Sequence, residues 1–136
     1  IRVRPFGEIG AQLREGPAGS FLTVSNPHDL VVHATVEIPY RNFGPMEWEL
    51  PPRGAWILPL DVRLVGLDKG WILVRANAEV HAVKITETAI ELVFRVPALS
   101  EDFEAELSRP DGQRYIVKAD GTAGRACMNL EKSVSI

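Results

Sequence analysis

Three histidines, one cysteine and several closely spaced carboxylates are the residues of this chain whose types could do chemistry. A metal site needs ligands that converge, such as histidines alternating along one strand or lying one turn apart on a helix. His28 falls in a turn, whereas His33 and His81 fall in two separate predicted strands, and no Cys/His cluster accompanies them. We therefore predict no metal site and no cofactor.

The residue patterns do not support nucleophilic or acid–base catalysis either. Cys127 and the serines stand outside any G-x-S-x-G pattern, and Gly121 to Arg125 lacks the lysine and spacing of a phosphate-binding loop. The carboxylate pairs lie on the solvated faces of predicted strands: Glu47 with Glu49, and Glu104 with Glu106. The two catalytic carboxyl groups of a glycosidase need a buried cleft that separates their pKa values. We therefore predict no catalytic residue in this chain.

A row of polar residues offers a candidate contact surface. Arg75, Asn77, Glu79 and His81 alternate with small residues, so we expect all four to project from one face of a sheet. A water-facing surface explains the row more simply than a ligand site does. Contact with a neighbouring domain stays open, because the small residues between them indicate tight packing behind the row.

The three tryptophans raise the question of carbohydrate binding, since flat aromatic faces stack on sugar rings. Trp48 and Trp56 share the register of neighbouring apolar residues, which predicts that both are in the core. Trp71 lies outside the register of Ile72 and Val74. It is therefore the tryptophan predicted to be exposed and the candidate for sugar stacking.

The bulk composition predicts one globular domain that covers residues 1–136. Hydrophobic residues make up 46% and charged residues 24%, which is ordinary for a globular protein. A net charge of −3, a pI near 5.6 and singly scattered lysines and arginines argue against nucleic-acid or anionic-membrane partners. No apolar segment approaches the roughly 20 residues that span a bilayer.

Cys127 is the only cysteine, which excludes an intrachain disulfide. Together with the lack of a signal peptide, this favours a cytoplasmic location. A chain that begins at Ile1 rather than methionine is expected to be a mature fragment or an excised domain.

Period-two alternation predicts antiparallel strands throughout. From Leu30 to Ile38, every second residue is apolar, beginning with Leu30 itself. The predicted strands are Phe21–Ser25, Leu30–Ile38, Met46–Leu50, Trp56–Leu64, Ile72–Ala82, Thr88–Val96, Phe103–Leu107 and Arg114–Lys118. Turn signals stand at Asn26–Asp29 and Arg109–Gly112. The pattern predicts an all-β, antiparallel β-sandwich or jelly-roll-like domain.

Several details of this strand assignment have alternative interpretations. A short helix from Ser100 to Leu107 is the alternative to the strand there, but the turn that follows favours the strand. Alternation from Trp56 to Leu64 predicts that the five apolar residues at even positions share one face, while Pro59 predicts an edge or a bulge. Asp120 to Ser133 is expected to be a loop, with a terminal strand as an alternative for its end.

Three of these stretches resemble an all-β domain of glycoside hydrolase family 35 β-galactosidases. They are Phe21 to Asn26, Leu50 to Val62 and Ile72 to Val80, in the family's order and spacing. At Arg75 to Asn77 the family more often has Tyr-Ser-Thr. The resemblance implies a β-domain that follows the catalytic barrel of a retaining exo-glycosidase, which removes β-galactose or, in some archaeal relatives, β-glucosamine.

That resemblance implies no catalytic residue in this chain. The family's two catalytic glutamates lie on a TIM barrel, which needs about 250 residues. The expected function is an accessory, non-catalytic domain whose partner is the catalytic barrel of the same parent chain. The alternatives are an independent carbohydrate-binding module that uses Trp71 and an immunoglobulin-like interaction domain.

Overall fold

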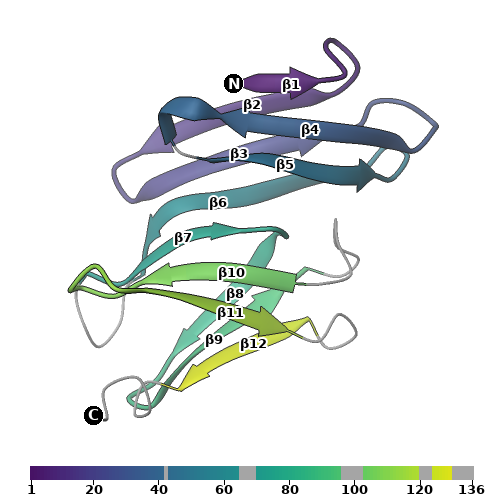
Figure 1. Cartoon of the computed structure of the whole chain (residues 1–136). Coiled ribbons are helices and arrows are strands. Elements are labelled where there is room, and N and C mark those ends of the chain that lie inside the picture. Colours follow the sequence, from purple (N-terminus) through teal and green to yellow (C-terminus); the bar gives the residue numbers. More distant parts are fainter. Residues whose placement is uncertain (42, 65–69, 96–102, 120–123, 130–136) are drawn as a thin grey trace.

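Twelve β-strands and one short 3-10 helix form the regular structure in residues 1–41, 43–64, 70–95, 103–119 and 124–129, the ranges that the computed structural model describes (Figure 1). These ranges contain no α-helix and thus no helix able to cross a membrane. The elements are β1 (Arg2–Arg4), β2 (Gly10–Gly16), β3 (Gly19–Ser25), β4 (Val32–Ile38), η1 (Pro39–Arg41), β5 (Phe43–Leu50), β6 (Ala55–Arg63), β7 (Ile72–Ala76), β8 (Val80–Ile85), β9 (Ala89–Phe94), β10 (Phe103–Ser108), β11 (Arg114–Ala119) and β12 (Arg125–Asn129).

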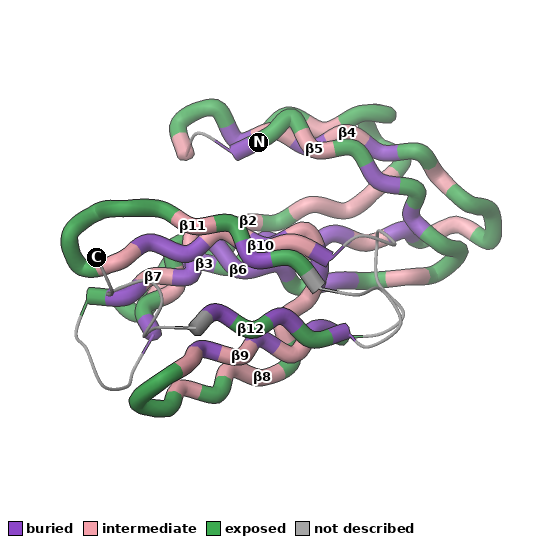
Figure 2. The backbone as a smooth tube through the Cα atoms, turned by 60° about the horizontal axis from the view of Figure 1, so that its bottom comes forward, coloured by how far each residue is buried: buried purple, intermediate pink, exposed green. Residues whose placement is uncertain are grey.

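The strands pair into three antiparallel sheets. The largest has six strands in the order β11-β10-β7-β6-β3-β2. Two three-stranded sheets, β1-β4-β5 and β12-β9-β8, lie on opposite faces of this central sheet (Figure 2). The predicted all-β antiparallel sandwich is confirmed.

The two outer sheets cover different halves of the central sheet, and each encloses its own core. The first core lies between β1-β4-β5 and the β2-β3-β6 half, and it includes Leu22, Ile38, Trp48, Trp56 and Leu58. The second core lies between β12-β9-β8 and the β7-β10-β11 half, and it includes Trp71, Leu73, Leu92, Phe94 and Phe103. Each half of the central sheet therefore has one covered face and one uncovered face.

Strand β6 contributes to both cores. Trp56, Leu58 and Leu60 pack in the first core. Asp61 then adopts a left-handed backbone conformation with φ of 50°, and Val62 and Leu64 pack against the second core. The predicted common face is therefore wrong beyond Leu60, because the left-handed residue interrupts the alternation of side chains.

Strand β7 has an irregularity beside this point. On β10, Glu106 pairs with Arg75, whereas the next residue, Leu107, pairs with Leu73. Val74 is thus an extra residue on β7, as in a β-bulge. The alternation from Ile72 to Ala82 predicts an inward position for Val74. That prediction is wrong, because the bulge shifts the register and Leu73 is buried instead.

The predicted strand from Ile72 to Ala82 is in fact two strands in different sheets. β7 belongs to the central sheet and β8 to the outer sheet, and the chain crosses between them from Asn77 to Glu79. Ala76 and Ala78 are both buried in the second core. The alternation of buried and less buried residues therefore continues through the crossover, so the sequence pattern does not indicate the change of sheet.

Pro59 lies on a strand that is central in its sheet but is locally unpaired on one side. It faces Phe21 of β3, whereas the pairing of β6 with β7 begins at Leu60. Ile57, two residues earlier, directs its N–H away from β3 to Glu79. The missing N–H of Pro59 falls on that same open side, so the proline interrupts no ladder hydrogen bond.

The remaining predictions have mixed outcomes. The strand, not the helix, is confirmed at Phe103–Ser108. Leu30 is 75% exposed, because β4 begins only at Val32, so its predicted place on the buried face is wrong. The segment expected to be mainly loop contains β12 at Arg125–Asn129. Val96, Ser100 to Asp102, Asp120 to Ala123 and the residues from Leu130 onward lie outside the described ranges.

Candidate functional site

The predicted polar row does not form one face, because the chain changes sheets within it. Arg75 lies on the uncovered face of the β7-β10-β11 half. Asn77 extends the pairing with β10: its N–H donates to the Glu104 carbonyl at 3.0 Å, and its Oδ1 accepts from the Glu104 N–H at 2.8 Å. His81 is exposed on β8. The prediction of a common surface for the four residues is wrong.

Glu79, the remaining member of the row, closes the open edge of β6. Its carboxylate lies 2.9 Å from the Arg95 guanidinium and accepts from the Ile57 N–H at 3.3 Å. Arg95 in turn donates to the Ala55 carbonyl at 3.2 Å. This ion pair replaces the ladder hydrogen bonds that β7 does not reach.

Trp71 is buried, not exposed. Its exposed fraction is 5%, it packs in the second core, and the Arg109 guanidinium lies 6.0 Å from the ring centroid. That distance is within the range of a cation–π contact. The predicted stacking platform is therefore wrong, because the irregular register of β7 turns Trp71 and Leu73 inward. Trp48 and Trp56 are buried, as predicted.

The three histidines and the cysteine belong to different parts of the fold: His28 to a turn, His33 to β4, His81 to β8 and Cys127 to β12. His28 Nε2 lies 3.0 Å from a Glu8 carboxylate oxygen, and His33 Nε2 lies 4.0 Å from Glu47. Cys127 is exposed on β12. Within the described ranges, no group of three or more His, Cys, Asp or Glu side chains could hold a metal ion.

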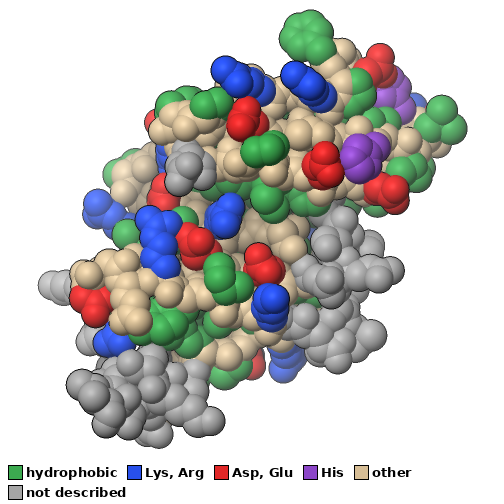
Figure 3. Space-filling view, viewed as in Figure 1, with side chains coloured by type: hydrophobic (Ala, Val, Ile, Leu, Met, Phe, Trp, Pro, Cys, Tyr) green, Lys and Arg blue, Asp and Glu red, His purple; other side chains and the backbone are tan. Residues whose placement is uncertain are grey.

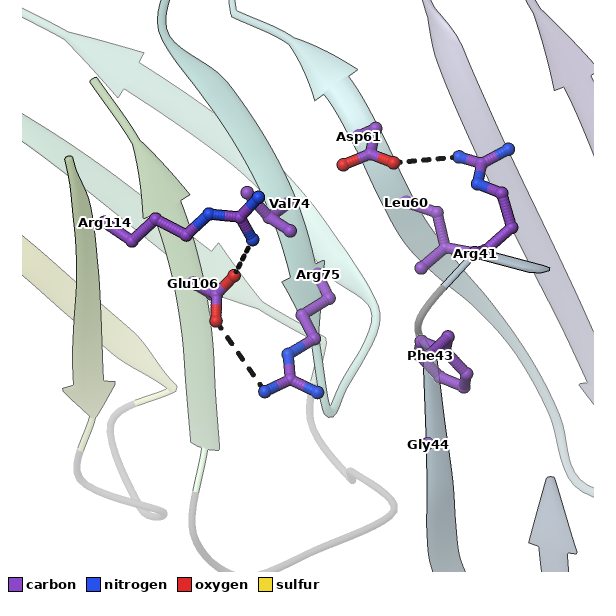
Figure 4. Close-up of a pocket in the computed structure, with 9 residues that line it drawn as sticks. All are labelled: Arg41, Phe43, Gly44, Leu60, Asp61, Val74, Arg75, Glu106 and Arg114. Atoms are coloured by element: carbon purple, nitrogen blue, oxygen red, sulfur yellow. Dashed lines mark hydrogen bonds and ion pairs between the residues drawn. The ribbon is translucent and has the colours of Figure 1, made fainter. Parts of the chain in front are cut away.

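A charged groove is the candidate binding site in the described part of the chain. Its volume is about 350 Å³, and it lies on the uncovered face of the β7-β10-β11 half, beside η1 and the start of β5 (Figure 4). A smaller cavity of about 60 Å³ adjoins it and shares Phe43, Arg75 and Glu106. The groove is lined by Arg41, Phe43, Gly44, Leu60, Asp61, Val74, Arg75, Glu106 and Arg114.

Ion pairs hold the charged side chains of the groove in place. On one wall, Arg41 lies 3.0 Å from Asp61. On the other wall, Glu106 lies 2.7 Å from Arg114 and 3.7 Å from Arg75 (Figure 4). Charged side chains of both signs gather over β7, β10 and β11 on this side of the molecule (Figure 3).

Glu15 and Tyr40 stabilise the wall of the groove that contains Arg41 and Asp61. Glu15 lies 3.5 Å from Arg41 and accepts a hydrogen bond of 3.2 Å from the Tyr40 hydroxyl. Desolvation and this hydrogen bond raise the pKa of Tyr40 above its ordinary value. The phenol therefore stays protonated, and keeps donating to Glu15, up to a higher pH than an ordinary tyrosine does.

Sequence reasoning pointed to one of the five charged lining residues, Arg75. The other four, Arg41, Asp61, Glu106 and Arg114, belong to η1, β6, β10 and β11, and no local motif links them. The sequence feature that could have indicated this site is Asp61, a residue type that can interrupt the alternation of side chains along β6. Aspartate tolerates the left-handed conformation better than most residues do.

A second surface is the uncovered face of the β2-β3-β6 half, which we call the β3–β6 face. Phe21, Thr23 and Ile57 lie on it, and Phe21 is 43% and Ile57 48% exposed. Arg14 and Gln12 of β2 pair with Phe21 and Thr23 and are exposed beside them. This arrangement places apolar side chains at the centre of the face and polar ones at its rim.

Comparisons of the chain with protein-family models, with curated proteins and with solved structures find no match.

Proposed function

We propose that this chain is an accessory, non-catalytic β-sandwich domain of a β-galactosidase-like glycoside hydrolase, and that it packs on the catalytic barrel of its parent chain. The β3–β6 face carries the proposal. Large apolar side chains at the centre of a half-exposed sheet face, with polar groups around them, are typical of a protein contact surface.

The order of the sheet is consistent with the resemblance. The three stretches that resemble the family include most of β3, most of β6 and all of β7, and these strands are neighbours in the central sheet. Stretches that are separated in the sequence thus form one continuous structural unit. Glu79, which belonged to the predicted contact row, lies at the edge of β6 beside Ile57 and joins the rim of the β3–β6 face.

The coding sequence on either side of residues 1–136 gives the first test. The proposal requires an upstream region of about 250 residues with alternating strands and helices, as a TIM barrel needs. A complete gene whose upstream region is too short for a barrel, or has no such alternation, would refute the proposal.

A pair of matched substitutions tests whether the β3–β6 face is the contact surface. Ile57 is 48% exposed on this face, and Ile116 is 49% exposed on the opposite, uncovered face of the central sheet. In the isolated chain, Ile57→Thr and Ile116→Thr are each expected to change the unfolding free energy by about 0.5 kcal/mol or less. In the parent protein, Ile57→Thr should lower the unfolding free energy by about 1–2 kcal/mol more than Ile116→Thr does, because the Ile57 substitution removes apolar surface that is buried in the proposed contact with the barrel.

Urea denaturation of both variants, in the isolated chain and in the parent protein, measures these differences. The isolated chain serves as the control for effects on the domain itself. Equal losses for the two variants in the parent protein would exclude the β3–β6 face as the docking surface.

A further inference from the structure

We propose that the charged groove on the opposite, uncovered face binds a neutral, polyhydroxylated small molecule, such as one or two sugar rings. This binding would be a second activity of the domain, and it does not depend on docking to a barrel. The groove and the β3–β6 face lie on opposite faces of the central sheet, so both can be occupied at once.

Backbone irregularities in neighbouring strands build the groove. Asp61 has its left-handed φ of 50° on β6, and the extra residue Val74 on β7 lies next to Arg75. Both irregularities lie where β6 and β7 meet, since Leu60 pairs with Arg75. Bulges and strained residues often re-aim side chains at binding sites. Here they turn Asp61 and Arg75 into the same cavity (Figure 4).

The positive and negative charges of the groove balance when Glu15, which contacts Arg41 without lining the groove, is included. Three guanidinium groups lie within 4.0 Å of three carboxylates, in the pairs Arg41 with Asp61, Arg41 with Glu15, Arg75 with Glu106, and Arg114 with Glu106. An anion would meet the carboxylates, and a cation would meet the guanidinium groups. Neither class of ion is favoured by this arrangement.

A hydroxyl group fits such walls because it can donate and accept at the same time. Ionised partners make hydrogen bonds roughly twice as strong as neutral ones do. The Arg75–Glu106 distance of 3.7 Å is too long for a direct hydrogen bond, so a ligand hydroxyl can bridge the two groups. Ile116 and Met46, beside the smaller cavity, offer apolar contact for the C–H face of a ring.

The size of the groove agrees with this class of ligand. A volume of about 350 Å³ lies at the lower end of the range for small-molecule pockets, roughly 300–1,000 Å³. No tryptophan lines it, so the binding energy has to come mainly from hydrogen bonds. Dissociation constants in the millimolar range, about 1–10 mM, are therefore expected.

Nuclear magnetic resonance titration of the isolated, isotope-labelled chain tests the proposal. The probes are lactose and cellobiose as neutral disaccharides, and sodium malonate as an anion, each up to about 100 mM, well above the expected dissociation constants. Lactose or cellobiose should shift the amide signals of Asp61, Arg75, Glu106 and Arg114, and malonate should not. No saturable shift with either sugar, or stronger binding of malonate, would overturn the proposal.

Two variants and a matched control locate the binding. Glu106→Gln and Arg75→Met should each weaken sugar binding roughly tenfold or more, because each removes a charged hydrogen-bond partner. Glu91→Gln is the control, since Glu91 is a strand glutamate paired with Lys84 at 3.8 Å on the β8–β9 hairpin. Unchanged sugar binding in both groove variants would refute the assignment of the site. A sugar that binds here gives no evidence for a barrel, and a missing barrel does not remove this site.

Discussion

Replacement of Asn26 by alanine is expected to lower the free energy of unfolding by about 2–4 kcal/mol. Asn26 is only 2% exposed and joins the turn after β3 to the chain at the end of β5. Its Nδ2 donates to the carbonyl oxygens of Leu30, Leu50 and Pro51 at 2.8, 3.1 and 3.1 Å, and its Oδ1 accepts from the His28 N–H at 2.9 Å. Alanine would leave these main-chain groups without their partner, and the buried contact with Leu50 would be the most costly to lose.

Asn26→Asp is the sharper form of this test. Aspartate has the same shape but places a carboxylate oxygen where Nδ2 donates, so it loses the three contacts and gains repulsion from the carbonyls. Its destabilisation should equal or exceed that of alanine, whereas Gln12→Ala on the exposed part of β2 should cost about 0.5 kcal/mol or less. Urea denaturation measures all three variants. A loss below about 1 kcal/mol for Asn26→Asp would show that these hydrogen bonds do not hold the segments together.

Gly19→Ala is expected to destabilise the fold by about 3–5 kcal/mol. Gly19 has a φ of 148°, and a Cβ added there would lie 2.6 Å from the Val62 Cα and 3.1 Å from the Asp61 carbonyl oxygen. The unfavourable backbone conformation costs about 1–3 kcal/mol for an L-residue. The clash adds a similar amount, because the Val62 Cα and the Asp61 carbonyl oxygen are main-chain atoms of β6 that cannot rotate away.

Gly112→Ala separates the two causes. Gly112 also has a positive φ, of 89°, but a Cβ there would meet nothing within 4 Å. It should therefore cost only about 1–2 kcal/mol, from the backbone conformation alone. Thermal unfolding of both variants gives the comparison. Equal losses would show that the close approach of β3 to β6 near Asp61 is not rigid.

Alternation in the sequence predicted the strands that have one buried and one exposed face. β4, β9 and β10 are examples, since every second residue there is buried. β2 was not predicted, because Gly10–Gly16 is mostly exposed and has glycine at both ends. The division between β7 and β8 was not predicted either, since buried Ala76 and Ala78 preserve the period through the crossover.

The candidate site was much less predictable than the fold. Arg75 stood out because it belongs to a polar row, but its partner Glu106 is 31 positions later in the sequence, and only the pairing of β7 with β10 brings them together. Trp71 was misassigned for the same reason. The bulge and the switch of faces depend on how neighbouring strands pair, and that pairing has no local pattern.

Hydrolysis of a chromogenic β-galactoside tests the proposed function most directly. We expect the full product of the gene that encodes residues 1–136 to cleave this substrate, since the proposal places the catalytic glutamates in its barrel. We expect the isolated chain of residues 1–136 to show no cleavage above the rate of the buffer. Cleavage by the isolated chain, or an inactive full product without a barrel region, would contradict the proposal of an accessory, non-catalytic domain.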